Sequence, residues 1–194
     1  MQNMSDEELM CKYQEGEMNA MDELLIRYRN PLYRFALRLS RNATEAQDIA
    51  QEVFLKIHQF RNEYRPIGKF RTWIFSIAHN LCISRMRKTK WLVFWPRKHD
   101  APDELMDFES PDPSPQQVAS GNEMSEIVKC CIQGLPFLQK EALILREYEN
   151  LDYREIGQIL HKPVGTVKTL LYRARVQLKN QLLPYMGPEG GYNV

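Results

Sequence analysis

The amino-acid sequence predicts an all-α protein in which two small helical domains are joined by an acidic, flexible linker. Apolar residues recur at steps of three or four along most of the chain, which is the spacing of a buried helical stripe. This spacing disappears between residues 96 and 122, where prolines stand among acidic and small polar residues. It then resumes and ends in a pattern typical of a helix-turn-helix.

Composition narrows the class of protein further. The 194 residues are 43 % hydrophobic and 26 % charged, which is enough apolar material for one or two cores. No apolar stretch approaches the roughly 18 to 20 residues of a membrane helix. The acidic N-terminus also lacks the basic region followed by an apolar region that is typical of a signal peptide. We therefore expect a cytoplasmic protein without membrane insertion.

Residues 1–95 form the first predicted domain. Ser5 and Glu8 have the spacing of a capping box and predict the start of a helix. The apolar stripe over residues 21–39 contains Pro31. This stripe is therefore either one kinked helix or two helices, the second of which starts at the proline.

Two further helices complete this domain. A second capping box, Thr44 with Gln47, predicts a helix over residues 44–59 with an apolar face. After a turn that contains Pro66 and Gly68, helical spacing returns over residues 70–89. We expect these helices to form one compact bundle.

Residues 96–122 form the predicted acidic, Pro-rich linker, and residues 123–183 form the second predicted domain. Helical spacing resumes near Met124, breaks at Leu135-Pro136 and continues afterwards. Residues 184–194, rich in small residues, are expected to be a disordered tail.

The second domain ends in the predicted helix-turn-helix. Residues 152–160 indicate a short helix capped by Asp152, a turn follows at residues 161–165, and a longer helix begins after Pro163. The N-terminal part of such a second helix meets base edges in the major groove, which here selects Gly165, Thr166, Lys168 and Thr169. Tyr172, Arg173 and Arg175 continue the basic face.

The net charge of +1 conceals blocks of opposite sign. Residues 61–99 carry 10 basic groups and one acidic group, residues 100–127 carry 8 acidic groups and none that is basic, and residues 161–194 carry 5 basic groups and one acidic group. DNA would be attracted to both basic segments and repelled by the middle one. The blocks thus suggest two contact surfaces joined by a connector, with solvated helix faces as the alternative.

Residues 60–95 interleave aromatic and basic side chains, a mixture suited to single-stranded bases and phosphates. We expect this segment to expose aromatic faces, although Phe70 and Trp73 fit a hydrophobic core equally well. Asn80 lies in the middle of an apolar helical stretch, where its amide would need a partner.

The sequence lacks the usual signs of a metal site or a catalytic centre. Its four cysteines form no CxxC pair, and its four histidines are scattered. We expect reduced thiols, no cofactor, no metal, no small-molecule substrate and no enzymatic activity. The adjacent Cys130 and Cys131 leave a redox role open.

Four segments together resemble the extracytoplasmic function (ECF) sigma factors, small two-domain members of the bacterial sigma-70 family. They are AQDIAQEVFLKI (46–57), GKFRTWIFSIAHNLCISRMRK (68–88), LPFLQKEALILREYENLDYREIG (135–157) and PVGTVKTLLYRAR (163–175). Their order and spacing cover nearly the whole chain. The resemblance implies a promoter-melting bundle, a flexible linker and a domain that reads the −35 element.

The resemblance also assigns roles to individual residues. Core polymerase is expected to bind Asp48, Gln51, Glu52 and Leu55 through the coiled coil of its largest subunit, and the flap of the second-largest subunit is a further expected partner. The loop for the −10 element corresponds to residues 61–68. The expected −10 residues are Arg61, Asn62, Tyr64, Arg65, Lys69, Trp73, Asn80, Arg85, Arg87 and Lys88.

For the −35 element, the recognition helix of the family matches Lys168, Thr169, Tyr172 and Arg173, with Gly165 and Thr166 at its start. Arg146 and Arg175 are expected to contact the DNA backbone. Leu170 departs from the family, because many members carry a basic residue there, and the −35 preference is expected to differ accordingly.

The run from Trp91 to Trp95 is more apolar than the resemblance predicts, which suggests a surface for an anti-sigma factor or for polymerase. Two alternatives to a sigma factor remain. One is a stand-alone helix-turn-helix regulator that binds duplex DNA without polymerase, and the other is an enzyme acting on nucleic acid, for which no motif is present.

Overall fold

The computed structural model describes residues 4–93 and 123–185, and across these residues it contains helices and turns but no strand. The all-α prediction is confirmed. The N-terminal unit consists of α1 (Asp6–Gln14), α2 (Met18–Ser40), α3 (Ala43–Phe60), the short 3-10 helix η1 (Arg61–Glu63) and α4 (Phe70–Val93). The C-terminal unit consists of α5 (Glu123–Gln133), α6 (Phe137–Glu147), α7 (Tyr153–Leu160), α8 (Val164–Leu182) and η2 (Leu183–Tyr185).

Three predicted features lie outside the described residues. They are the linker over residues 96–122, the side chains of the Trp91 to Trp95 run, and most of the tail predicted over residues 184–194. The first two residues of that tail, Pro184 and Tyr185, instead belong to the 3-10 helix η2. The predicted break at Leu135-Pro136 is confirmed, because α5 ends at Gln133 and α6 begins at Phe137.

Capping side chains start three of the helices, two of them as predicted. Ser5 and Glu8 form the reciprocal capping box of α1, and Asp152 forms one with Glu155 at the start of α7. The prediction for α3 is wrong. Its cap is Asn42, whose side-chain oxygen accepts a hydrogen bond from the backbone N–H of Glu45, so the helix begins one residue before Thr44.

Pro31 lies inside one continuous helix, α2. The alternative in which a second helix starts at the proline is therefore wrong. Burial explains why the helix continues: on the same helix Leu24, Leu32 and Phe35 are completely buried, so packing offsets the backbone hydrogen bond that proline cannot make.

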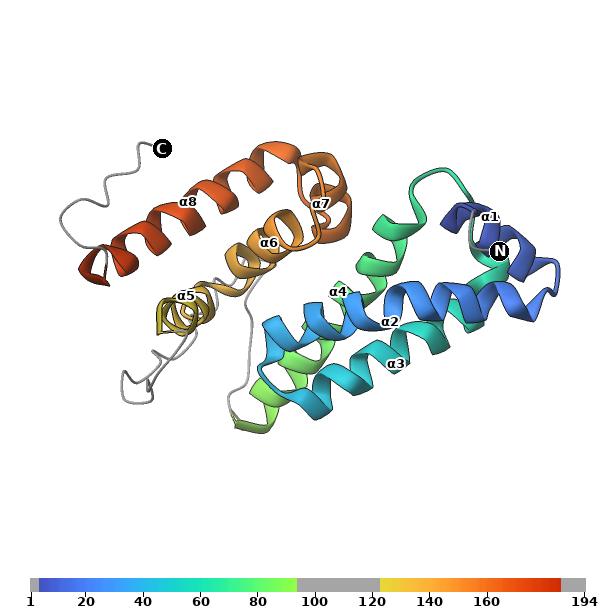
Figure 1. Cartoon of the computed structure of the whole chain (residues 1–194), viewed down its shortest axis with the longest axis horizontal. Coiled ribbons are helices and arrows are strands. Elements are labelled where there is room, and N and C mark those ends of the chain that lie inside the picture. The colour runs from blue at the N-terminus through green and yellow to red at the C-terminus, as the bar shows by residue number, and fades with distance from the viewer. Residues whose placement is uncertain (1–3, 94–122, 186–194) are drawn as a thin grey trace, which may run out of the picture.

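The N-terminal unit has a core to which all four of its helices contribute. Its largest fully buried side chains are Leu9, Met10, Leu24, Leu32, Phe35, Ile49, Ile57, Phe70, Ile74 and Phe75. Figure 1 shows α2 and α3 running alongside each other, with α1 at one end and α4 crossing the pair. This packing places the loop over residues 61–69 next to α1.

In the C-terminal unit, α6 packs against α8, and α7 packs against both. Gly157 of α7 permits a close approach of the following turn. A Cβ at this position would lie 2.7 Å from the carbonyl oxygen of Lys162, which no side chain tolerates without a shift of the backbone. Glycine is thus required by the tightness of the turn between α7 and α8.

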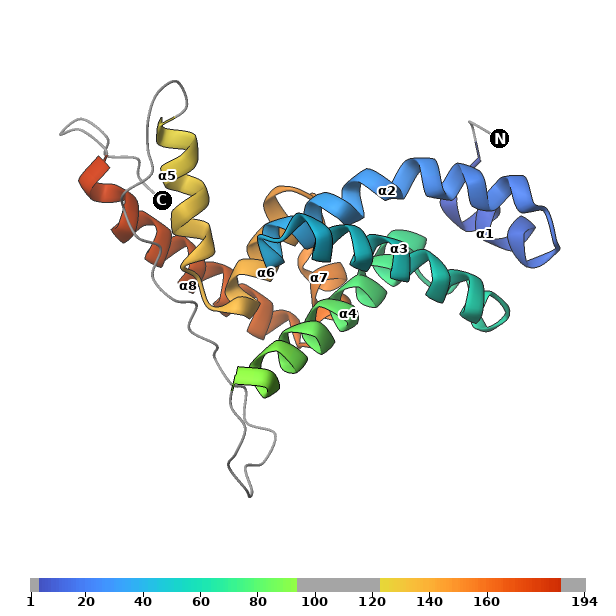
Figure 2. The same cartoon turned by 90° about the horizontal axis from the view of Figure 1, so that it is seen from below.

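The two units pack against each other, mainly through α7 on α4 and α6 on α2 (Figures 1 and 2). His79 and Glu141 form the buried centre of this contact, with 2.8 Å between Nδ1 and Oε1. Arg71 pairs with Glu149 at 2.9 Å, and Lys69 pairs with Glu155 at 2.8 Å. The sequence predicted two domains joined by a linker and did not indicate that the two domains pack against each other.

No helix among the described residues is long and apolar enough to cross a membrane.

Candidate polymerase and promoter interfaces

The exposed face of α3 carries the predicted polymerase-binding residues. Asp48, Gln51 and Leu55 are exposed and Glu52 is half-buried, while Ile49, Val53 and Ile57 of the same helix are buried. Leu55 is 68 % exposed and lies one turn from these polar side chains. The face therefore combines carboxylates with one apolar anchor.

Arg85 of α4 reaches across to this face. It donates to Glu52 at 2.9 Å and to Asp48 at 3.4 Å. The hydrogen bond with Glu52 raises the pKa of the Arg85 guanidinium. A hollow between α3 and α4 is lined by these three side chains together with Thr44, Ser84 and Lys88. Two predicted −10 residues, Arg85 and Lys88, and two predicted polymerase residues thus line one hollow.

The remaining predicted −10 residues lie on the 61–69 loop and along α4. Asn62, Arg65, Lys69, Asn80, Arg87 and Lys88 are exposed, whereas Arg61 and Trp73 are half-buried and Tyr64 is buried. Lys69 already pairs with Glu155 of α7, so the contact between the two units engages one of the predicted DNA-binding cations.

The expectation that this segment exposes aromatic faces is wrong for the aromatic residues that belong to the core. Tyr64, Phe70 and Phe75 are buried, and Tyr64 packs at 4.9 Å between ring centroids against the half-buried Trp73. Burial also raises the pKa of Tyr64 to about 12. Tyr64 thus packs the 61–69 loop against Phe70 and Trp73 of α4. Ile67 of the same loop is 92 % exposed and is a candidate contact that the aromatic and basic pattern of the sequence did not indicate.

Asn80 does not need the buried partner that its place in an apolar helical stretch suggested. Its side chain is exposed, so water satisfies the amide and no buried partner is required. Asn80 nevertheless lies on the same helix as Arg87 and Lys88, which are exposed as well.

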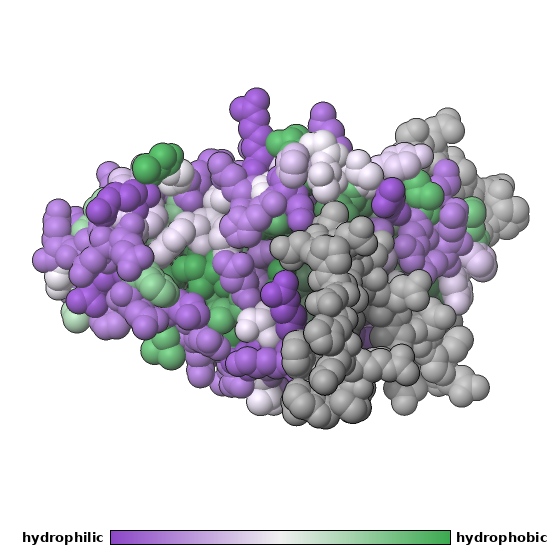
Figure 3. Space-filling model, turned by 180° about the vertical axis from the view of Figure 1, so that it is seen from behind, coloured by the Kyte–Doolittle hydropathy of each residue, from purple (hydrophilic) through white to green (hydrophobic). Residues whose placement is uncertain are grey.

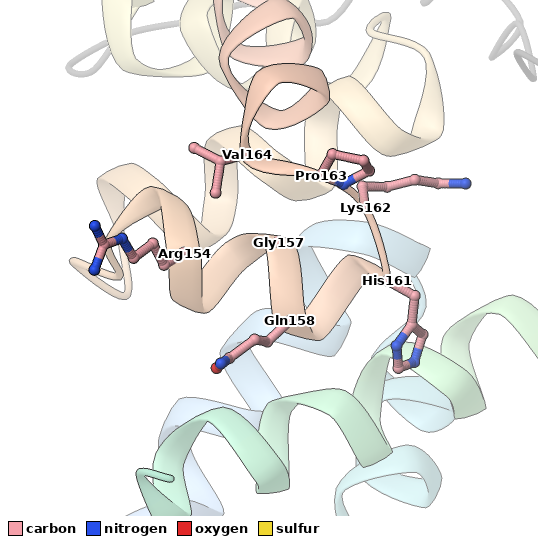
Figure 4. A pocket seen from close by; sticks show the side chains of 7 residues that line it. All are labelled: Arg154, Gly157, Gln158, His161, Lys162, Pro163 and Val164. Atoms are coloured by element: carbon pink, nitrogen blue, oxygen red, sulfur yellow. The ribbon is translucent and has the colours of Figure 1, made fainter.

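The helix-turn-helix has the predicted form. After α7, His161 adopts the left-handed backbone conformation with φ 53°, and Pro163 precedes the first residue of α8. Figure 4 shows the turn from close by: the chain leaves the end of α7 at His161 and passes Lys162 to Pro163, and the side chains of His161 and Lys162 point in different directions. The His161 ring faces the N-terminal unit, where its centroid lies 6.0 Å from that of His79.

The predicted −35 residues on α8 are available to a ligand. Gly165, Lys168, Thr169, Tyr172, Arg173 and Arg175 are exposed and Thr166 is half-buried, while Val167, Leu171 and Ala174 hold the helix to the core. The Thr169 hydroxyl donates to the carbonyl oxygen of Gly165. Arg175 pairs with Glu147 at 3.0 Å.

Arg146 has a structural contact that the sequence did not reveal. Its guanidinium donates to the carbonyl oxygen of Leu151 at 2.9 Å and lies 5.2 Å from the centroid of the Tyr153 ring. Arg146 therefore links the end of α6 to the start of α7, which is the first helix of the helix-turn-helix.

Exposed large apolar side chains are spread over several helices of the described residues. Figure 3 shows a face on which hydrophilic residues predominate and hydrophobic residues form separate patches. The most exposed of the large apolar residues that the structure describes are Ile67, Ile26, Tyr172, Leu55 and Met18.

Among the described residues no group of three or more His, Cys, Asp or Glu could hold a metal ion. Burial raises the pKa of the Cys131 thiol, which disfavours its reactive thiolate form.

Comparison with known proteins accounts for both units. The model of Sigma-70 region 2 matches residues 24–92, and that of Sigma-70, region 4 matches residues 125–178. The RNA polymerase sigma-H factor of Pseudomonas aeruginosa is 31 % identical over 93 % of this chain and 95 % of its own length. The ECF RNA polymerase sigma factor SigW of Bacillus subtilis is 31 % identical over 87 % of this chain and 91 % of its own length.

Two solved structures share the fold. CnrH in complex with the cytosolic domain of CnrY aligns with a TM-score of 0.68 at 20 % identity, covering 93 % of this chain and 99 % of CnrH. The sigma factor RpoE of Bartonella quintana, solved with the anti-sigma factor NepR, aligns with a TM-score of 0.63 at 24 % identity, covering 84 % of this chain and 96 % of RpoE.

The fold and its exposed faces define a helical protein with a helix-turn-helix and an exposed, carboxylate-bearing face on α3. The chain belongs to the sigma-70 family, and its relatives place it in the extracytoplasmic function group. The resemblance found in the sequence is confirmed.

Proposed function

We propose that this ECF sigma factor docks on core RNA polymerase through Asp48, Gln51, Glu52 and Leu55 of α3. In this proposal the 61–69 loop and the exposed side of α4 capture the −10 element, while the exposed side of α8 binds the −35 element. The protein itself makes and breaks no bond. It selects promoters by two short contacts at a fixed spacing.

One observation carries this proposal: both family models match in order on a chain whose α3 keeps an acidic face and an apolar anchor exposed. A stand-alone regulator would use the same α8, but would have no use for this face. The coiled coil of the largest polymerase subunit is the partner that the family resemblance implies for it.

We also propose that an anti-sigma factor controls this protein. CnrH and RpoE of Bartonella quintana were solved with CnrY and with the anti-sigma factor NepR, respectively. The Trp91 to Trp95 run remains a proposed contact for such a partner. Replacing Trp91 and Trp95 with serine and comparing the recovery of polymerase and host partners tests this proposal.

Run-off transcription with purified core polymerase and a promoter library tests the main proposal. The wild-type chain is compared with the triple variant Asp48→Ala/Gln51→Ala/Glu52→Ala, and Gln59→Ala on the exposed end of α3 is the matched control. We expect transcripts from one promoter class with the wild type and the control, and a loss of at least tenfold with the triple variant.

Transcription at the wild-type level by the triple variant would show that this face of α3 does not bind core polymerase. If core polymerase gains no promoter activity while the protein alone binds duplex DNA tightly, the chain is a stand-alone regulator and the proposal is wrong.

A further inference from the structure

Helix α1 lies outside the residues matched by the region 2 model, which begin at residue 24, and no role has been assigned to it. The structure places it against both ends of the 61–69 loop. Side chains from α1 bond to backbone groups at the start of the loop and at the residue that ends it.

Gln14 holds the start of the loop. Its side-chain nitrogen donates to the carbonyl oxygens of Arg61 at 2.6 Å and Tyr64 at 3.1 Å. Because both partners are acceptors, only the amide nitrogen fits this position. Arg65 donates to the carbonyl oxygens of Asn62 and Tyr64 from within the loop. The backbone of η1 is thus bonded, and the Asn62 side chain stays exposed.

Glu7 holds the end of the loop. Its carboxylate accepts a hydrogen bond of 2.7 Å from the backbone N–H of Phe70, the first residue of α4. The first N–H groups of a helix have no partner within the helix, so Glu7 satisfies a donor that would otherwise need water. The carboxylate therefore helps to fix where the loop stops and α4 begins.

Helix α1 is itself anchored firmly to α2. Asp6 accepts a hydrogen bond from Arg27 at 2.7 Å and another from the Tyr28 hydroxyl. Burial, with a further contribution from Asp6, raises the pKa of Tyr28, so its hydroxyl remains a donor at physiological pH. Leu9 and Met10 are completely buried.

The middle of the loop has little support of its own. Ile67 is 92 % exposed, and a Cβ added at Gly68 would meet nothing within 4 Å. Segments with few buried contacts open easily unless hydrogen bonds at their ends restrain them. The bonds to Gln14 and Glu7 lie at those ends.

We infer that Gln14 and Glu7 are positioning residues that hold the 61–69 loop in the conformation that reads the −10 element. This inference rests on the proposed role of the loop in −10 recognition. It adds α1 to the determinants of promoter selectivity, although α1 carries none of the predicted DNA contacts.

Transcription by the holoenzyme on a promoter library randomised at the −10 element tests the inference. Gln14→Glu keeps the shape of the side chain but replaces the donor with a carboxylate facing two carbonyl oxygens. We expect the activity ratio between preferred and disfavoured −10 sequences to fall about fivefold to thirtyfold, as expected for losing one or two hydrogen bonds. Selectivity at the −35 element should not change.

Two other variants separate positioning from general stability. Glu7→Gln keeps a carbonyl acceptor for Phe70 and should retain most of the −10 selectivity, whereas Glu7→Ala should lose it. Glu15→Gln, at an exposed residue that follows Gln14, is the matched control. Amide hydrogen exchange in the full chain should show faster exchange at residues 61–70 in Gln14→Glu and unchanged exchange in α6 and α8.

Unchanged −10 selectivity in Gln14→Glu would overturn the inference, as would equal losses at the −10 and −35 elements. Asn62→Ala distinguishes this failure from failure of the proposed function. If Asn62→Ala alters −10 selectivity and Gln14→Glu does not, the loop reads the promoter without help from α1. If neither variant alters it, the proposed role of the loop fails together with the inference.

Discussion

At the scale of single residues, acidic side chains already hold several of the cations predicted to meet DNA. Arg85 forms ion pairs with Glu52 and Asp48, Arg175 forms one with Glu147, and Lys69 forms one with Glu155. Ion pairs whose cation is solvent-exposed contribute little to stability, so a phosphate can replace the carboxylate. If Arg85 binds a phosphate, it releases Asp48 and Glu52, which are two of the residues proposed to bind polymerase.

Gly157 provides the sharpest prediction for a single residue. Gly157→Ala puts a Cβ against the Lys162 carbonyl, so the turn of the helix-turn-helix must shift. We expect a loss of about 1 to 3 kcal/mol in the free energy of unfolding, measured by urea denaturation. Gly165→Ala is the matched control, because its Cβ would lie in open space.

The control variant should be neutral or slightly stabilising, since alanine favours a helix over glycine by up to about 1 kcal/mol. Equal effects at the two glycines would show that the close approach at Gly157 does not limit the turn.

Asp152 predicts a dependence of stability on pH. Hydrogen bonds from the backbone N–H groups of Glu155 and Arg154 lower the pKa of its carboxyl below the ordinary value of 3.8. A carboxyl with a lowered pKa in the folded state stabilises that state above its unfolded pKa, and the effect is lost as pH falls through the folded pKa. Asp152→Ala should therefore melt below the wild type at pH 7.

The difference in melting temperature between Asp152→Ala and the wild type should shrink below about pH 4, the unfolded value of an aspartate. Calorimetric scans between pH 7 and pH 2.5 measure this trend. A difference that is constant over the whole range would mean that the charge of Asp152 does not contribute to the cap.

At the scale of elements, the sequence predicted what depends on local spacing and missed what depends on distant packing. The stripe of α3, the box at Ser5 and the cap at Asp152 were correct, because neighbours within four residues determine them. The stripe predicted for α2 was correct except at Leu25, which is exposed. The cap of α3 was wrong because Asn42 and Thr44 are both good capping residues, and only the backbone path decides between them.

The role of α1 could not be read from the sequence for the same reason. Gln14 and Arg61 are 47 residues apart, and Glu7 and Phe70 are 63 apart. An amphipathic stretch that ends in glutamine carries no signal for such contacts. In the candidate site, the spacing identified exposed residues such as Asp48 and Lys168, whereas the burial of Tyr64 required knowledge of the whole bundle.

At the scale of the whole molecule, the contact between the two units includes a buried polar part of α6. Gln139, Lys140 and Glu141 are each at most 5 % exposed. Burial lowers the pKa of Lys140, and Glu141 faces His79 of the other unit. The contact between the units thus pairs one of these buried carboxylates, Glu141, with a buried histidine of the other unit, whereas Lys140 donates to Gln133 of its own unit.

The ion pair between Arg71 and Glu149 provides a test of this closed arrangement. The Glu149 side chain is only 7 % exposed, so an arginine placed there would face Arg71 in a poorly solvated contact. We expect Glu149→Arg to shift the balance towards separated units by about 2 kcal/mol, roughly a thirtyfold change. Small-angle X-ray scattering of the full chain should then show a larger radius of gyration.

The double variant Glu149→Arg/Arg71→Glu restores opposite charges with exchanged positions and should return the radius to that of the wild type. Glu147→Arg is the control, because Glu147 pairs with Arg175 within its own unit. Opening would also separate Lys69 from Glu155 and leave that cation to promoter phosphates. A radius of gyration in Glu149→Arg equal to that of the wild type would mean that the pair does not hold the units together.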